Sequence, residues 1–180
     1  MTSLPPAPPD LSVGTPPSRA DPGRPIDLVY IAGTHRSGGT ALGTILSSAA
    51  GVFYAGELYR FPRPIFDPGD PGRMCSCGSP VATCVFWAGV RADAEAHPAL
   101  LADLRKGQRR FEEWRRFPAT LLGLSRKNAP VDRHAERMGV FLRIVADRAG
   151  ASTVVESSYS PLRGILYRRA NLGGGRVRFI

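Results

Sequence analysis

The chain has 180 residues, with 24 Lys and Arg against 15 Asp and Glu and a formal net charge of +9. This length predicts one domain, and the apolar fraction of 43 % excludes a chain that is disordered throughout. The positive charge favours anionic partners such as nucleotides, phosphate or sulfate esters and nucleic acid. The sequence lacks the run of about 20 apolar residues that spans a membrane and lacks a signal-peptide pattern, so we expect a cytoplasmic protein.

The N-terminal part of the chain predicts a tail followed by a β-α-β unit. Residues 1–25 are rich in proline and predict a disordered tail, while residues 26–180 predict one α/β domain. The nearly continuous apolar run at 26–32 is typical of a strand buried on both faces. A helix is expected at 40–50 and a second strand at 52–55. The face expected to be buried on that helix consists of Leu42, Ile45, Leu46 and Ala49.

The rest of the chain continues the alternation of helices and strands. The remaining expected elements are an irregular excursion at 61–80, helical patterns within 90–127, an amphipathic helix at 131–149, a strand at 152–156, a helix at 161–170 and a strand at 176–180. Strands that alternate with helices predict a parallel sheet. Because a core strand seldom ends a chain, we expect the domain to be truncated at its C-terminus.

A glycine-rich loop joins the first expected strand to the first expected helix. Its residues are, in order, Gly33, Thr34, His35, Arg36, Ser37, Gly38, Gly39 and Thr40. The spacing follows the nucleotide-binding pattern G-x-x-x-x-G-K-[ST], except that a glycine stands where the pattern has Lys. Backbone N–H groups at such a helix N-terminus form an anion site. Since Arg36 is the cation of this loop, we expect a site for one phosphate carrying a group of lower charge, without a metal.

Residues 36–42 resemble the 5′-phosphosulfate loop of the sulfotransferases, commonly R/K-S-G-T-T-x-L, with Gly39 in place of the first Thr. Those enzymes have a P-loop-like three-layer α/β fold with a central parallel sheet, and they use 3′-phosphoadenosine 5′-phosphosulfate (PAPS). The resemblance implies the same fold and co-substrate here. The loop residues that it implies for PAPS binding are Arg36, Ser37, Gly38, Gly39, Thr40 and Ala41.

A second resemblance directly follows the second expected strand. Residues 56–60 read Gly-Glu-Leu-Tyr-Arg and resemble the G-E-x-x-R element of the tyrosylprotein-sulfotransferase-like branch. There the Glu is the general base and the Arg orients it or the substrate, so the resemblance implies these roles for Glu57 and Arg60. The element and the glycine loop both follow parallel strands, whose carboxyl ends form the edge where α/β sheets bind ligands.

A third resemblance follows the strand at 152–156. Bacterial sulfotransferase-like proteins often show D-S-S-K-x-P there, and this chain reads Glu-Ser-Ser-Tyr-Ser-Pro from Glu156 to Pro161. Tyr159 stands where the family has a Lys that points at the sulfonate, and it can donate a hydrogen bond but carries no charge. The resemblance implies that Tyr159 contacts the leaving group and that Ser158 contacts PAPS. The family's element for the 3′-phosphate would lie beyond Ile180.

These motifs predict a sulfotransferase that moves a sulfonate group from PAPS to an acceptor hydroxyl. Glu57 would take the proton of the acceptor, and Arg36 would neutralise the charge that grows on the bridging oxygen. The expected partners are PAPS and a hydroxyl-bearing acceptor, with no nucleic acid, no membrane and no metal. Peptide tyrosine, a carbohydrate and a small natural product all remain open as the acceptor.

Other interpretations remain open beside this one. A nucleotide kinase or NTPase with a degenerate P-loop would need Mg²⁺, whereas sulfuryl transfer would not. A non-catalytic remnant of the family would bind nucleotide weakly or not at all, and Tyr159 favours that interpretation. Ser157 and Ser158 could only cap the helix that begins near Pro161. The basic run at 105–116 is expected to be a solvated helix face without the aromatic interleaving of a nucleic-acid site.

Three cysteines, Cys75, Cys77 and Cys84, lie within ten residues. Their surroundings resemble a C-x-C-G-x-P-x-x-x-C-x-F-W element of bacterial sulfotransferase-like proteins. An odd and clustered set argues against a disulfide-stapled secreted fold. A structural zinc takes four ligands, and beyond the remote His97 no fourth is evident. We therefore expect a reduced, partly buried packing motif and no metal site.

Overall fold

The computed structural model describes residues 24–34, 36–60, 74–75, 77–113, 118 and 128–180. The tail predicted at 1–25 and much of the excursion predicted at 61–80 lie outside these residues. In chain order the elements are β1 (Asp27–Tyr30), α1 (Gly39–Leu46), β2 (Val52–Gly56), the 3-10 turns η1 (Leu58–Arg60) and η2 (Val81–Thr83), α2 (Val85–Glu95), α3 (Leu100–Gly107), the π-helical turn η3 (Gln108–Glu112), α5 (Ala129–Ala149), β3 (Thr153–Glu156), α6 (Pro161–Tyr167) and β4 (Val177–Phe179).

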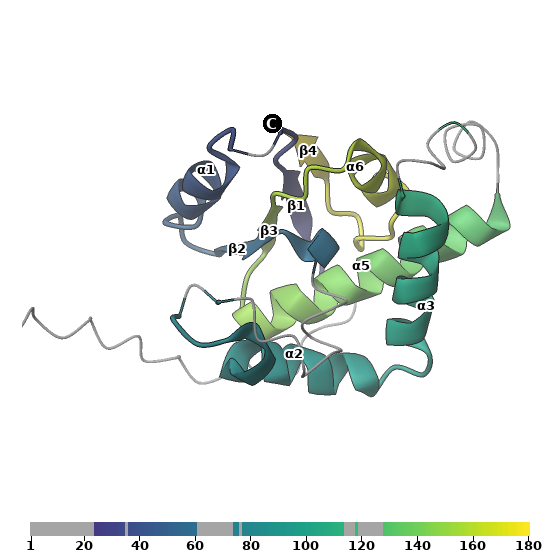
Figure 1. Ribbon diagram of the computed structural model, residues 1–180, viewed down its shortest axis with the longest axis horizontal. Coiled ribbons are helices and arrows are strands. Elements are labelled where there is room, and N and C mark those ends of the chain that lie inside the picture. The colour runs from purple at the N-terminus through teal and green to yellow at the C-terminus, as the bar shows by residue number, and fades with distance from the viewer. Residues whose placement is uncertain (1–23, 35, 61–73, 76, 114–117, 119–127) are drawn as a thin grey trace, which may run out of the picture.

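The protein has an α/β fold built on one sheet of four parallel strands in the order β2-β3-β1-β4 (Figure 1). The α/β class and the parallel sheet predicted from the sequence are confirmed. The four predicted strands are present, and the helix predicted at 131–149 is α5, which has a proline in its first turn and ends at Gly150 in the left-handed conformation. No helix among the described residues is both long enough and apolar enough to cross a membrane.

Helices pack on both faces of the sheet, because successive side chains of a strand point to opposite faces. On β2, Tyr54 lies against Gly43 of α1, while the ring of Phe53 stacks on Phe86 of α2. Helix α5 contacts β2, β3, α2, α3 and α6, so these helices share the face opposite α1 (Figure 1). Most of the hydrophobic core lies on that side, between α5 and the sheet.

The burial of two predicted elements differs from the expectation. The first strand was expected to be buried on both faces, but in β1 only Leu28 and Tyr30 are buried, while Asp27 and Val29 are partly exposed. Helix α1 packs over β2 and β3 and leaves β1 partly uncovered. In α1 itself the buried residues are Gly39 and Gly43.

The expected apolar face of α1 is therefore wrong. Ile45 is 67 % exposed, Leu42 and Leu46 are half-buried, and Ala49 lies exposed beyond the end of the helix. The physical reason is the size of the side chain that the helix meets. The Tyr54 ring takes the space under α1, and only the bare backbone of a glycine can approach it.

A buried ionic network connects β3, α5, α6 and η3. Arg163 of α6 donates from Nη1 to Glu112 at 2.7 Å and from Nε to Glu156 at 2.8 Å. His134 of α5 lies 2.8 Å from the other oxygen of Glu112, and the Arg163 guanidinium lies over the ring of Tyr167, 5.3 Å from its centroid. The side chain of Arg163 is 6 % exposed, and those of Glu112 and Glu156 are fully buried. One cation thus joins two carboxylates that lie far apart in the sequence.

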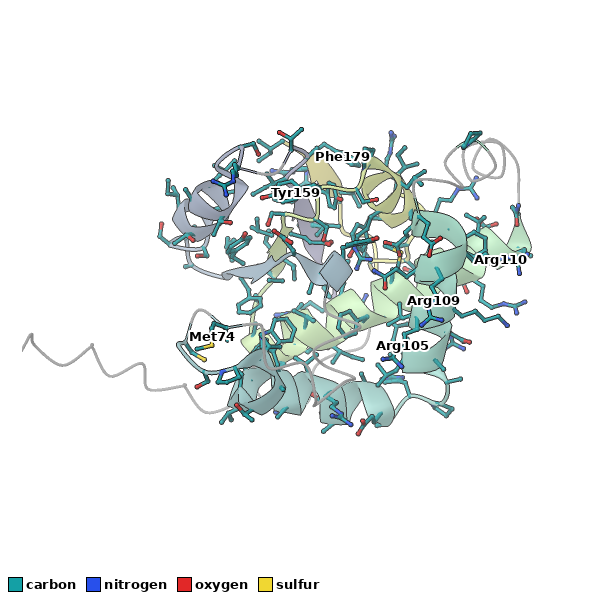
Figure 2. All side chains as sticks on the ribbon, viewed as in Figure 1. Met74, Arg105, Arg109, Arg110, Tyr159 and Phe179 are labelled. Atoms are coloured by element: carbon teal, nitrogen blue, oxygen red, sulfur yellow. The ribbon has the colours of Figure 1, made fainter. Side chains whose placement is uncertain are left out.

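Burial and nearby charges shift the pKa values of the two carboxyls in opposite directions. Burial raises the pKa of Glu156, and the nearby Arg163 only partly opposes this effect. For Glu112, burial also disfavours the ionised form, but the Arg163 guanidinium and His134 together hold its pKa below the usual value. The sequence predicts a solvated face for the basic run at 105–116. Arg105, Arg109 and Arg110 are exposed as expected (Figure 2), but the prediction is wrong at Glu112, which is buried.

The network predicts a large loss of stability when Arg163 is removed. The variant Arg163→Met leaves two buried carboxylates without their cation, and we expect the free energy of unfolding to fall by about 3–5 kcal/mol at neutral pH. Without the guanidinium, burial is less opposed and raises the pKa of Glu156 in the folded state further above the unfolded value, while Glu112 keeps its contact with His134. A carboxyl whose folded-state pKa is raised contributes stability at low pH that is lost as pH rises, so the deficit shrinks in acid. Urea denaturation at neutral and acidic pH measures both effects.

The matched control is Arg91→Met, which removes an exposed pair with Glu95 on the surface of α2. An exposed pair of this kind contributes about 1 kcal/mol or less, so the control should change little at either pH. Equal losses for the two variants, or a deficit of Arg163→Met that grows in acid, would contradict the role assigned to the network.

Candidate functional site

The four strands end at one level, which gathers the segments that follow them. Tyr30 of β1 is in register with Glu156 of β3 and with Phe179 of β4, and Gly56 of β2 is in register with Glu156. Each of these residues is the last of its strand. The glycine loop, Glu57 and the segment 157–159 therefore leave the sheet side by side at its carboxyl edge, where open α/β sheets bind ligands.

The glycine loop leads into a helix that has no side-chain cap. Gly38 precedes α1 with a φ of 83°, and the N–H of Leu42 makes a hydrogen bond of 2.9 Å to the carbonyl of Gly38. The N–H groups of the three residues between them, Gly39, Thr40 and Ala41, have no acceptor within the helix. The N–H of Ser37 is used inside the loop, on the carbonyl of Thr34. This geometry offers three backbone donors at the positive end of the helix.

Arg36 lies in this loop in the left-handed backbone conformation, with a φ of 66°. Among the described residues, only Ala99 shares this feature without being a glycine. The conformation costs about 1 kcal/mol or more for a residue with a side chain and is typical of functional loops. The Arg36 side chain is exposed, so its guanidinium adds positive charge beside the start of α1. His35 lies outside the described residues.

The segment after β3 lies between the two other parts of the site. On one side, Tyr159 packs against the glycine loop: a methyl group placed on Gly39 would lie 3.4 Å from its hydroxyl, and one on Gly33 would lie 3.9 Å from its ring (Figure 2). On the other side, the N–H of Tyr59, two residues after Glu57, donates to Oγ of Ser158 at 2.8 Å. The segment thus joins the loop after β1 to the residues after β2.

The hydroxyls of Ser157 and Ser158 are buried and already have partners. Oγ of Ser157 lies 2.7 Å from the hydroxyl of Tyr54, and Ser158 donates to a carboxylate oxygen of Glu156. Neither residue caps the following helix, since Oγ of Ser160 accepts from the N–H of Arg163. The alternative interpretation that Ser157 or Ser158 caps this helix is therefore wrong. The geometry gives both hydroxyls a role in holding the strand ends together.

Glu57 follows β2 directly and is half-buried at the carboxyl edge. Strand β3 lies between β2 and β1, so the backbones at Glu57 and at the glycine loop are about 10 Å apart, two strand spacings. The segment after β3, with Ser158 and Tyr159, lies in this interval. Arg60 ends η1, and its side chain lies outside what the structure describes.

Two residues of this region were missed by the sequence analysis. Tyr54 packs on Gly43 of α1 and contacts Ser157, so it sets the height of the glycine loop over the sheet. Arg163 holds Glu156, the last residue of β3. The sequence marked Tyr54 only as a residue of the second expected strand, and the irregularity in the pairing between Tyr54 and Gly56 breaks the alternation that would assign its face. The sequence did not mark the partner of Arg163, since the contact depends on tertiary packing.

A cavity of about 210 Å³ lies away from the strand ends, between α3, η3 and α5. Its lining includes Lys106, Arg110, Arg133, His134 and Arg137. One of these cations, Arg137, pairs with Asp103 at 3.2 Å. None of the glycine-loop residues, Glu57 or Tyr159 contributes to its wall.

The three cysteines form a second cluster of reactive side chains. Cys77 is exposed, Cys75 is half-buried and Cys84 is buried. A hydrogen bond from the backbone N–H of Ser79, together with the neighbouring thiols, lowers the pKa of Cys77 to about 7. Burial raises the pKa of Cys84 to about 11.

Comparison of the chain with protein-family models found no match, and comparisons with curated proteins and with solved structures also found none. The interpretation of the site therefore rests on its geometry and on the motifs of the sequence.

The contact between α1 and β2 predicts that a methyl group at Gly43 is destabilising. Alanine normally favours a helix by about 1 kcal/mol over glycine. At Gly43, however, the added carbon would come within 2.6 Å of three atoms of the Tyr54 ring. We expect Gly43→Ala to lower the free energy of unfolding by about 1–3 kcal/mol, the usual effect of overpacking, measured by urea denaturation.

Thr44→Ala is the control, because Thr44 is the next residue of the same helix and is exposed. It should be neutral within about 0.5 kcal/mol. A Gly43→Ala protein as stable as the parent would show that Tyr54 does not set the position of α1.

Proposed function

We propose that the protein is a sulfotransferase with a P-loop-like three-layer α/β fold, which takes PAPS at its glycine loop and transfers the sulfonate to an acceptor hydroxyl. The observation that carries the proposal is the convergence of three motifs at one edge of the sheet. The glycine loop, Glu57 and Tyr159 come from three different strand ends, and the register of the strands brings those ends to one level.

The glycine loop supports the proposal through its donors. The N–H groups of Gly39, Thr40 and Ala41 open from the start of α1, and Arg36 adds a guanidinium with a fork of donors. A phosphosulfate has two tetrahedral anionic groups joined by one oxygen, which suits backbone donors and a nearby Arg. We propose that Ser37 and Gly38 contribute by the shape of the loop, since the N–H of Ser37 is bonded to Thr34.

The chemical step needs a base on the acceptor side and a cation on the donor side. The proton of the acceptor hydroxyl passes to the carboxylate of Glu57 while its oxygen forms a bond to sulfur. The bond between sulfur and the bridging oxygen breaks, and 3′,5′-ADP leaves with the electron pair on that oxygen. Arg36 stabilises the charge on the leaving oxygen. We propose that Arg60 orients Glu57 or the substrate.

Tyr159 is proposed to donate a hydrogen bond to the leaving group. The support is its position against Gly33 and Gly39, which places its hydroxyl near the start of α1. Ser158 is proposed to act by position, because its own hydroxyl is bonded to Glu156 and to the N–H of Tyr59. Its backbone then sets the height at which Tyr159 meets the loop.

The alternatives make different predictions about metal and nucleotide. A nucleotide kinase or NTPase would bind ATP with Mg²⁺ and lose function in EDTA, whereas PAPS binding would survive the chelator. The absence of a Lys at Gly39 favours PAPS over ATP, since the Lys supplies charge to the outer phosphates. A non-catalytic remnant would bind neither nucleotide.

Arg36→Ala tests the loop. Calorimetry with PAPS and with 3′,5′-ADP in EDTA should show binding to the parent and a loss of at least about tenfold in the affinity of the variant for PAPS, because a charge-assisted hydrogen bond contributes about 1.5–3 kcal/mol. Alanine keeps the backbone cost of the left-handed conformation, so the change isolates the guanidinium. Transfer of labelled sulfonate from PAPS should fall by about 100-fold or more.

The matched control is Arg109→Ala, which removes the same charge from an exposed position on η3 (Figure 2). Its affinity for PAPS should equal that of the parent. If the parent and Arg36→Ala bind PAPS with equal affinity, the glycine loop is not the PAPS site. Binding of ATP that requires Mg²⁺ would favour the kinase instead.

Tyr159 is tested by two opposite substitutions. Tyr159→Phe removes the hydroxyl and should weaken PAPS binding by about threefold to tenfold, the usual effect of one neutral hydrogen bond. Tyr159→Lys supplies the cation that the family has at this position and should strengthen binding. If calorimetry shows that Tyr159→Phe binds PAPS as well as the parent does, the hydroxyl has no contact with it.

A further inference from the structure

The sulfur atoms of Cys75, Cys77 and Cys84 converge on one point. All three lie within 4.8 Å of one another, and the sulfurs of Cys77 and Cys84 are 3.6 Å apart. Two thiolates bound to one tetrahedral zinc, each about 2.3 Å from the metal, lie about 3.8 Å apart. The observed separation therefore fits a shared metal ion, whereas a disulfide has a sulfur–sulfur distance of about 2.05 Å.

The turn that carries two of the cysteines is held in a fixed shape. The N–H of Cys75 donates to the carbonyl of Ser79 at 2.8 Å, and the N–H of Gly78 donates back to the carbonyl of Cys75 at 2.9 Å. Gly78 has a φ of 85°, which only glycine adopts without strain. Met74 and Pro80 close the turn with an antiparallel bridge.

The third cysteine stands at the start of a helix. Cys84 is the residue before α2, with an extended backbone and no hydrogen bond from its side chain to cap the helix. The thiolate is the form of cysteine that binds metal, and the positive end of a helix favours it.

We infer that Cys75, Cys77 and Cys84 form a three-thiolate site for zinc, with the fourth position of the metal taken by water or another small donor. Soft sulfur ligands select zinc over magnesium or calcium, which prefer oxygen. The sequence favoured a packing motif because it shows three ligands rather than four. Packing alone does not account for the position of Cys77, which is exposed to solvent and yet lies with its sulfur against that of the buried Cys84.

Zinc at this site would fix the Cys75–Ser79 turn to the start of α2. That end of α2 carries Phe86, whose ring lies 4.9 Å from the ring of Phe53 on β2. Strand β2 ends just before Glu57. The metal would therefore stabilise the start of α2 and, through Phe86 and Phe53, the contact of α2 with β2, and it takes no part in the chemical step.

The experiment measures metal directly. The protein is produced in medium containing zinc, purified under reducing conditions without a metal-affinity step, and analysed by inductively coupled plasma mass spectrometry. We expect one zinc per chain. Replacing it with Co²⁺ should give the charge-transfer absorption of cobalt bound to thiolates, and EDTA should lower the midpoint of thermal unfolding.

The key variant is Cys77→Ser, because Cys77 is exposed and its loss should not unfold the protein. It should retain its fold by circular dichroism and lose zinc and the cobalt spectrum. Thr83→Ser is the control, since Thr83 is exposed and lies next to Cys84, and it should keep one zinc. With zinc bound, all three thiols should resist alkylation.

Two results would overturn the inference. Reduced parent protein that carries no stoichiometric zinc and gives no cobalt spectrum has no metal site. A disulfide between Cys77 and Cys84 in protein isolated without reductant, found by peptide mapping, would make the cluster a redox pair. These readouts involve no nucleotide, so they stand or fall separately from the proposed PAPS site.

Discussion

The position of the candidate site depends on one buried cation, Arg163. Its guanidinium joins Glu156, the last residue of β3, to Glu112 on η3, and so connects the centre of the sheet to the helical layer. Glu156 in turn accepts from Ser158, and Ser158 accepts from the N–H of Tyr59. The path of the chain after β3 is therefore set by charge and hydrogen bonds rather than by apolar packing. Removing the cation would leave both buried carboxylates without the guanidinium that compensates their charge, which destabilises the fold.

This arrangement gives the carboxyl edge of the sheet two layers of polar groups. The inner layer consists of groups that have partners in the fold, namely the buried Glu156, Ser157 and Ser158 and the partly buried hydroxyl of Tyr54. The outer layer is at least partly exposed and includes Arg36 and Glu57. Residues of the inner layer position the outer ones, and only the outer ones can reach a ligand. In the proposed site, Ser158 would therefore act by holding its neighbours in place and not by contacting the ligand.

The opposite side of the molecule is organised by smaller contacts. Phe53 and Phe86 join β2 to α2, and the three cysteines gather where α2 begins. A zinc ion there would stabilise a region with few helical or strand hydrogen bonds of its own. The proposed PAPS site and the proposed zinc site lie at the two ends of the segment that connects β2 to α2, at Glu57 and at Cys84. The two sites use different chemistry.

The sequence by itself determined the order of the elements and the class of the fold. Alternation of short apolar runs with amphipathic segments predicted all four strands and the long helix α5, because those patterns depend on local periodicity. It also placed the glycine loop and Glu57 directly after strands, which is enough to bring them to the same edge of a parallel sheet. The amphipathic pattern of α5 also predicted its buried face, but the tertiary structure alone decided burial where contacts between distant segments override the local pattern. Gly43 rather than Ile45 faces the sheet because of the Tyr54 ring, and Glu112 is buried in a basic run because Arg163 lies opposite it. Such contacts join residues far apart in the chain, and no local pattern encodes them.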